Sequence, residues 1–115
     1  MHFSKFYYII LFVLFSCKKE ISLKRFTNYN QVENYLSTNS FKVDETTDTG
    51  NSSFITSAHF QSEDGEKGFL TLGMKRKEYH FSNVPIEVWE RFKNANSKGK
   101  FYHRNIKGKY SIKLK

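Results

Sequence analysis

The strongest constraint on the fold is a series of short segments between residues 54 and 81 in which apolar and polar residues alternate. Alternation with a period of two places every second side chain on the same face of a β-strand. Tight turns separate the segments, one with an Asp-Gly pair and one with three basic residues. Short strands joined by such turns predict an antiparallel meander. The expected strands are residues 54–60, 69–74 and 79–81, and the expected turns are residues 62–65 and 75–77.

Two short helices are expected after the meander. Pro85 favours the first position of a helix, where a missing backbone N–H costs nothing. Ser97 is a good N-cap for a second helix, which we expect to run from Lys98 to Lys107. Gly108 is able to end that helix. The last residues, 110–114, are expected to form a final strand.

The segment before the meander predicts one more helix and a loop. Thr27 or Asn28 can cap a helix that runs to about Thr38, with an apolar stripe that includes Val32 and Leu36. A brief strand is expected at 41–43, and the wholly polar stretch 44–53 predicts a loop and a domain boundary. The sequence thus predicts an α+β fold. In it, a small antiparallel meander of three to four strands packs with two short helices and is preceded by a short N-terminal helical segment.

The first seventeen residues have the pattern of a signal peptide. Lys5 precedes an apolar run at 6–15, which has the length of a signal-peptide core and is too short to span a bilayer. The run ends in Leu14-Phe15-Ser16-Cys17, which resembles the bacterial lipobox, although Phe15 is bulkier than that pattern usually shows. Cys17 is the single cysteine of the chain. The alternative is an ordinary secretory signal with a chance cysteine.

The lipobox resemblance implies cleavage before Cys17 and attachment of a diacylglycerol to its sulfur. Residues 1–16 are then a lipoprotein signal peptide, 17–50 a tether with a short helix and strand, and 51–115 a C-terminal domain. Acyl chains attached to one residue hold a protein on a membrane. We therefore expect a lipoprotein, anchored to a membrane, in the bacterial cell envelope.

Positive charge is concentrated in the last third of the chain. The net charge is +8, yet residues 20–74 have four basic and eight acidic side chains, whereas residues 75–115 have twelve basic and three acidic ones. This split predicts a basic C-terminal face that binds an anionic partner. Lys100, Arg104 and Lys107 lie at i, i+4 and i+7 on one side of the expected second helix. The candidate binding residues are Lys98, Lys100, Arg104, Lys107 and Lys109.

Aromatic residues near this basic face have two interpretations. They are either stacking planes for nucleic-acid bases or part of the core. We favour packing for Tyr79 and Phe81, because the helix that begins at Pro85 has to lie on one face of the sheet. The same interpretation applies to Tyr102, which shares a helix side with Ile106. The aromatic candidates are Tyr79, Phe81, Phe101, Tyr102 and Tyr110.

The C-terminal half resembles a known family over residues 52–115. The most specific run is Val84–Tyr110, with Val84-Pro85, Trp89, Phe92 and Gly99 among its matching residues. This pattern resembles the KTSC domain, named for a segment at the C-terminus of some lysyl-tRNA synthetases. The sequence departs from the family in lacking a glycine at the turn 75–77, in Phe81 for a second Tyr and in His103 for Asn. The resemblance implies no established activity and suggests RNA binding only by its context.

No pattern in the sequence indicates catalysis, a metal or a cofactor. His59, His80 and His103 fall on separate predicted elements without the spacing of a metal site. The sequence has neither a nucleophile elbow nor a glycine-rich phosphate loop. We therefore expect a non-enzymatic binding module without a cofactor.

Three partners remain open at this point. The first is an acidic envelope partner for the basic face: a protein, a lipid head group or a polymer. The second is a nucleic acid, which is the alternative that the family context suggests. The third is a protein that binds the acidic first half, through Glu33, Asp44, Glu45 and Asp48.

Overall fold

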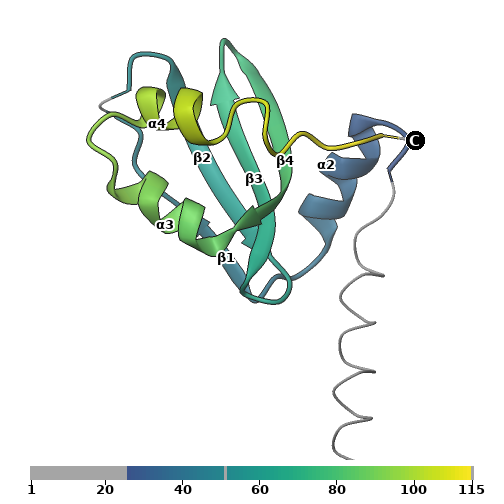
Figure 1. The fold of residues 1–115 in the computed structure, drawn as a ribbon. Coiled ribbons are helices and arrows are strands. Elements are labelled where there is room, and N and C mark those ends of the chain that lie inside the picture. Colours follow the sequence, from purple (N-terminus) through teal and green to yellow (C-terminus); the bar gives the residue numbers. More distant parts are fainter. Residues whose placement is uncertain (1–25, 51, 115) are drawn as a thin grey trace, which may run out of the picture.

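The computed structural model describes residues 26–50 and 52–114 (Figure 1). The predicted signal peptide, Cys17 and the tether up to residue 25 lie outside the described residues. The fold is α+β, as the sequence predicted. In chain order, its elements are α2 (Tyr29–Thr38), β1 (Val43–Thr46), β2 (Ile55–Ser62), β3 (Lys67–Met74), β4 (Lys77–Pro85), α3 (Ile86–Asn94) and α4 (Lys98–Asn105).

The four strands form one antiparallel sheet in the order β1-β2-β3-β4. Each strand pairs with its neighbour in the sequence, so the sheet is the predicted meander with β1 added at its edge. The predicted loop at 44–53 is wrong at its start, because Asp44, Glu45 and Thr46 pair with β2. An edge strand has one face and one edge in solvent, so it needs no apolar pattern of its own.

The end of the chain differs from the predicted strand at 110–114. Only Ser111 bridges to β4, opposite Phe81, and the backbone N–H of Ser82 donates to the carbonyl of Tyr110 over 2.9 Å. Ile112 is buried, and it packs on the other side of the molecule. The segment therefore crosses the β4 edge rather than extending the sheet.

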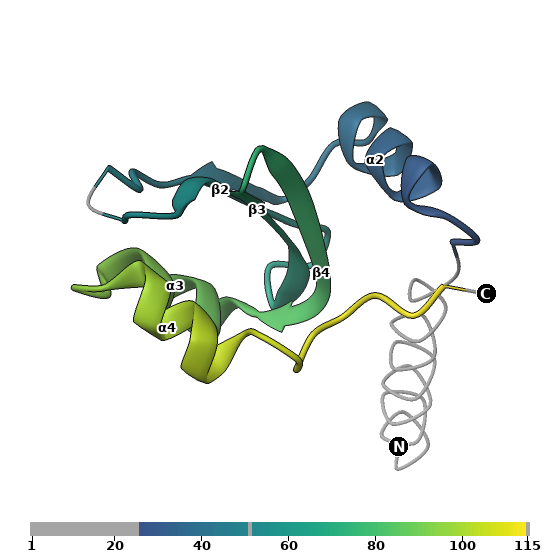
Figure 2. The same ribbon diagram turned by 90° about the horizontal axis from the view of Figure 1, so that it is seen from above.

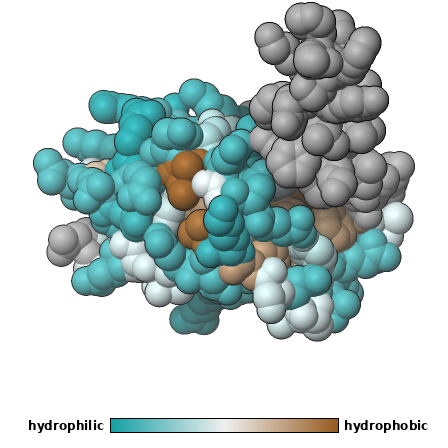
Figure 3. All heavy atoms as spheres, turned by 90° about the horizontal axis from the view of Figure 1, so that it is seen from below, coloured by the Kyte–Doolittle hydropathy of each residue, from teal (hydrophilic) through white to brown (hydrophobic). Residues whose placement is uncertain are grey.

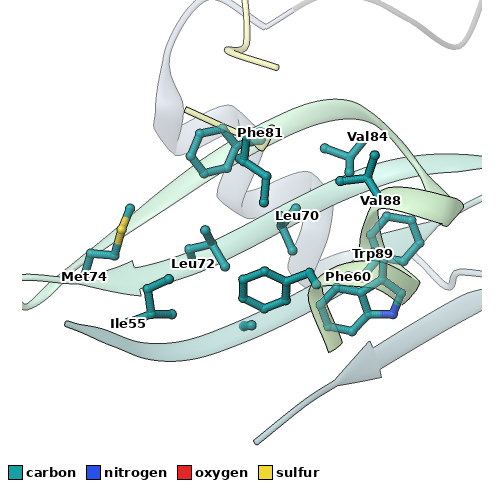
Figure 4. Packing of buried hydrophobic residues seen from close by; sticks show 12 residues of the cluster. Ile55, Phe60, Leu70, Leu72, Met74, Phe81, Val84, Val88 and Trp89 are labelled. Atoms are coloured by element: carbon teal, nitrogen blue, oxygen red, sulfur yellow. The ribbon is translucent and has the colours of Figure 1, made fainter. Parts of the chain in front are cut away.

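Helices cover the two faces of the sheet unequally (Figure 2). α3 and α4 lie on one face, and α2 lies on the other. The α3 and α4 face holds the main core, in which side chains of β2, β3, β4 and α3 point toward one another (Figure 4). The indole of Trp89 is fully buried between the rings of Phe60 and Phe92, with ring centroids 5.4 and 5.9 Å away.

A second, smaller cluster anchors α2. Val32 and Leu36 of α2 pack with Ile112, and partly buried aromatic side chains surround them. The side-chain amide of Gln61 on β2 donates to the carbonyl of Leu36 over 2.9 Å. Residues 26–50 are thus packed on the sheet, and they leave part of that face uncovered beyond α2.

Helices α2 and α4 begin at the capping residues that the sequence predicted. The Asn28 side chain accepts from the backbone N–H of Gln31 over 2.9 Å, and the Ser97 hydroxyl accepts from that of Lys100 over 3.2 Å. α4 stops at Asn105, two residues before the predicted end, and Gly108 follows with a φ of +77°. No helix in the described ranges has the length and apolar character needed to cross a bilayer.

Candidate functional site

The outer side of α4 presents the basic residues that the sequence singled out. Lys100, Arg104, Lys107 and Lys109 are all exposed, and we call them the α4 basic surface. Buried Ile106 and partly buried Tyr102 hold the opposite side of this segment on the core. Within residues 26–50 and 52–114, no ion pair involves any of the four cations. Their charge is therefore available to a partner.

Lys98, the fifth predicted basic residue, has a different place. Its ammonium donates to the backbone carbonyls of Lys93 and Ala95, over 3.1 and 3.5 Å, and it lies 5.8 Å from the ring centroid of Phe92. Lysine is favourable there because the C-terminus of a helix exposes unpaired carbonyls and a partial negative charge. Lys98 therefore stabilises the end of α3.

Arg91 adds a cation that the sequence did not assign to this surface. Arg91 follows Glu87 by four positions, a spacing at which the two side chains of a helix can form an ion pair. In the structure, its guanidinium carbon lies 5.3 Å from the ring centroid of Phe101 on α4. Arg91 is exposed and thus lies beside the α4 basic surface. Only the packing of α3 on α4 brings these two residues together.

The candidate aromatic residues belong mainly to the core. Phe81 is 7% exposed, and Phe101, Tyr102 and Tyr110 are partly buried against the main cluster. Burial, together with nearby Tyr79, raises the pKa of the Tyr102 hydroxyl above its ordinary value. Tyr79, at 37%, is the most exposed of the five. Packing, the favoured interpretation for Tyr79, Phe81 and Tyr102, holds for Phe81 and Tyr102 but not for the exposed Tyr79. Phe101 and Tyr110, for which both interpretations were open, also pack on the core.

A polar groove lies on the other face of the sheet, next to α2. It has a volume of about 540 Å³. One row of cross-strand partners forms part of its floor, with Thr46 opposite His59, His59 opposite Thr71 and Thr71 opposite His80. Glu33 of α2 and the segment 46–49 line its sides. The groove combines hydroxyl, imidazole and carboxylate groups, which the sequence did not show to be neighbours.

The exposed surface is otherwise mostly hydrophilic on the side seen in Figure 3. Hydrophobic residues reach the surface there only in small patches. The large exposed hydrophobic residues of the described part are Tyr29, Tyr79 and Leu114. On that side, the described surface is therefore suited to polar and charged partners rather than to a broad apolar one.

A comparison with protein families matches residues 51–110 to the KTSC domain. The match covers more than half of the 115 residues. The chain belongs to the KTSC domain family. The matched region contains β2, β3, β4, α3 and α4, and with them the main core and the α4 basic surface, whereas β1 and α2 precede it. No curated protein and no solved structure matched the chain.

Proposed function

We propose that this protein is a membrane-anchored lipoprotein of the bacterial cell envelope whose KTSC domain is a non-enzymatic binding module for an acidic partner. The observation that supports the binding role is the α4 basic surface. Four exposed cations lie on α4 and the residues directly after it without an ion-pair partner in the described part of the chain. A concentrated field of one sign attracts and orients a partner of the opposite sign.

The burial of the aromatic residues favours an acidic surface over single-stranded RNA as the partner. Proteins that bind single strands combine basic residues with exposed aromatic rings on which the bases stack. Here Phe101 and Tyr102 turn toward Phe92 and Phe81, with ring centroids 6.0 and 6.1 Å apart. The α4 basic surface thus offers charge without a matching set of stacking planes.

The position of α4 favours an acidic protein or polymer over the lipid surface that holds the anchor. Figures 1 and 2 place α2, which follows the tether in the sequence, at one end of the described part of the molecule and α4 at the opposite end. Cys17 and residue 26 are nine positions apart, which corresponds to about 30 Å at full extension. A tether of this length allows the α4 basic surface to face away from the membrane.

The anchor is tested by replacing the cysteine. Cells expressing the wild-type protein or Cys17→Ala are labelled with radioactive palmitate and separated into membrane and soluble fractions. We expect label and membrane association in the wild type, and loss of both in the variant, because the acyl chains supply the membrane affinity. Equal membrane association of the two proteins would contradict the proposed anchor.

The binding surface is tested by reversing its charge. Lys100→Glu/Arg104→Glu is compared with Lys42→Glu/Lys113→Glu, which makes the same change in charge at exposed lysines outside α4. The probe is immobilised poly-glutamate. Loss of two surface ion pairs, each contributing up to about 1 kcal/mol, should weaken binding by the α4 variant roughly tenfold.

Binding of the wild type and of both variants is measured at several salt concentrations, because dissolved salt screens the interactions of surface charges. The control variant should stay closer to the wild type than the α4 variant at every concentration. A short single-stranded RNA serves as the second probe. Equal weakening by the two variants would refute a specific role of α4, and tighter binding to RNA than to poly-glutamate would favour the nucleic-acid alternative.

A further inference from the structure

Three potential metal ligands from distant parts of the sequence meet at one end of the groove. Glu33 comes from α2, and Glu78 and His80 come from β4. Glu78 and His80 are two residues apart in a strand, so their side chains point to the same face of the sheet. Their carboxylate oxygens and one imidazole nitrogen all lie within 4.8 Å of one another.

His80 is oriented as a ligating histidine usually is. Its side chain is only 5% exposed, although it lies on the polar face of the sheet. Its Nδ1 forms a 2.8 Å hydrogen bond with the hydroxyl of Thr71, its cross-strand partner. A hydrogen bond at one ring nitrogen fixes the orientation of the ring and points the other nitrogen at the ligand position. The other ring nitrogen, Nε2, points to the Glu33 carboxylate, and its distance to Glu33 Oε2 is 3.4 Å.

The hydroxyl of Thr71 fits both states of this histidine. A hydroxyl donates or accepts, so it pairs with either neutral tautomer of the imidazole. Without an ion, the Nε2–H of His80 donates to the Glu33 carboxylate, and the Thr71 hydroxyl donates to Nδ1. With an ion on Nε2, the Nδ1–H donates to the Thr71 oxygen instead.

In the described part of the chain, no lysine or arginine balances the negative charges of the Glu33 and Glu78 carboxylates. Neither carboxylate forms an ion pair with lysine or arginine among the residues that the structure describes. Within the described part of the chain, the Glu33 side chain has a polar contact only with His80, and no hydrogen bond involves the Glu78 side chain. Two carboxylates held next to one another repel unless a proton or cation lies between them.

We propose that Glu33, Glu78 and His80 form a binding site for a divalent transition-metal ion. Ligand atoms about 2.1 Å from a tetrahedral ion are about 3.4 Å apart, which is already the separation of Glu33 Oε2 and His80 Nε2. Glu78 is exposed, and its flexible side chain can close the remaining distance. An imidazole with two carboxylates suits Zn²⁺ or a neighbouring transition metal better than Mg²⁺.

The groove gives this site an open side. Three protein ligands leave at least one coordination position for water or for an oxygen atom of a bound molecule. Thr46, Thr56 and Ser57 line the same groove, so they offer hydroxyl groups to a molecule bound beside the ion. The site is on the opposite face from the α4 basic surface, so it is independent of the proposed function.

Direct titration of the full-length protein tests this site. The protein is purified in detergent with a tag that contains no histidine, and ZnCl₂ is added in a calorimeter. We expect one equivalent of Zn²⁺ to bind, and the ion to stay bound in excess Mg²⁺. Glu33→Gln and Glu78→Gln keep the side-chain shape and remove a ligand charge, so each should weaken binding by about tenfold or more.

Two further variants separate the site from general metal binding. Thr71→Val removes only the hydroxyl behind His80 and should weaken binding about tenfold. Asp44→Asn removes the carboxylate that contacts His59 on the same sheet face and should leave the affinity unchanged. Zn²⁺ should also raise the thermal midpoint of the wild type but not of Glu33→Gln/Glu78→Gln. Substoichiometric binding, or equal affinities in the Glu33, Glu78 and Asp44 variants, would overturn the proposal.

Discussion

At the scale of single residues, Glu45 connects the edge of the sheet to a helix. Its carboxylate accepts hydrogen bonds from the indole N–H of Trp89 over 2.8 Å and from the ammonium of Lys93 over 3.0 Å. The hydrogen bond from Trp89, followed by that from Lys93, holds the pKa of Glu45 below its ordinary value of 4.5. Since Trp89 is the centre of the aromatic stack, Glu45 couples β1 to the core in addition to the packing of Val43.

The lowered pKa of Glu45 predicts a contribution to acid sensitivity. A carboxyl with a lower pKa in the folded state stabilises the fold above its unfolded pKa, and this stabilisation is lost as the pH falls through the folded pKa. We expect Glu45→Gln to lower the thermal midpoint at neutral pH and to lose less stability than the wild type below about pH 4.5. Thermal unfolding followed across this pH range measures both effects.

Glu87→Gln provides the control for Glu45, because the Glu87 side chain is exposed on α3 and forms no hydrogen bond or ion pair in the described part of the chain. Its pH profile should overlay that of the wild type. A Glu45 variant with the wild-type profile would show that this carboxylate does not stabilise the fold.

Gly68 is a second residue whose identity is set by its neighbours. It lies where the register of β3 and β4 shifts, and an added Cβ would overlap the carbonyl oxygen of Gln61 and lie 2.8 Å from the Cβ of Ser62. We expect Gly68→Ala to destabilise the protein by about 1–3 kcal/mol, as overpacking does. Urea denaturation measures the change. Gly50→Ala, in an exposed loop, should have a much smaller effect.

At the scale of elements, α4 depends on its cap. The helix has only eight residues and no fully buried side chain, so its own hydrogen bonds matter more than in a long helix. We expect Ser97→Ala to cost about 1 kcal/mol, because the backbone N–H of Lys100 loses its acceptor. Faster amide hydrogen exchange at Lys100 is the measurement.

Ser53→Ala, an exposed serine with no side-chain hydrogen bond in the described part, is the matched control for this helix. In this variant, the amide hydrogen exchange rates of α4 should be the same as in the wild type. If α4 carries the proposed interface, Ser97→Ala should also weaken binding to poly-glutamate, since the cations are then held less rigidly. Unchanged exchange at Lys100 would contradict the role of the cap.

The elements also show where local patterns were sufficient and where they were not. Capping residues and turn residues predicted α2, the start of α4 and the β2–β3 turn, because these signals act within a few positions of the chain. The polar residues of β1 carried no such signal. Asp44 and Glu45 are in a strand because the edge of β2 is available to pair with them.

At the scale of the whole molecule, the part of the chain before the family match completes the fold. β1 pairs with β2, and α2 packs its Val32 and Leu36 against Ile112 and the neighbouring aromatic residues. We expect a chain of residues 51–115 to be less stable than one of residues 26–115, because it loses the Glu45 contacts and uncovers the second cluster. It should also self-associate through the unpaired edge of β2.

Urea denaturation and light scattering of these two chains provide the measurement. We expect the chain of residues 51–115 to have a lower free energy of unfolding and a larger apparent mass than a monomer. The chain of residues 26–115 should be monomeric at the same concentration. Equal stability and equal mass would show that the family region is complete without β1 and α2.

The sequence alone determined the features that depend on neighbours along the chain: the alternating strands, the capped helices, the basic side of α4 and the family resemblance. Only the tertiary structure decided which groups meet across elements. It joined Arg91 to Phe101, Glu45 to Trp89, and Glu33 to His80 across 47 positions of sequence. Periodicity states which face a side chain lies on, but the packing of one element on another decides what that face contacts.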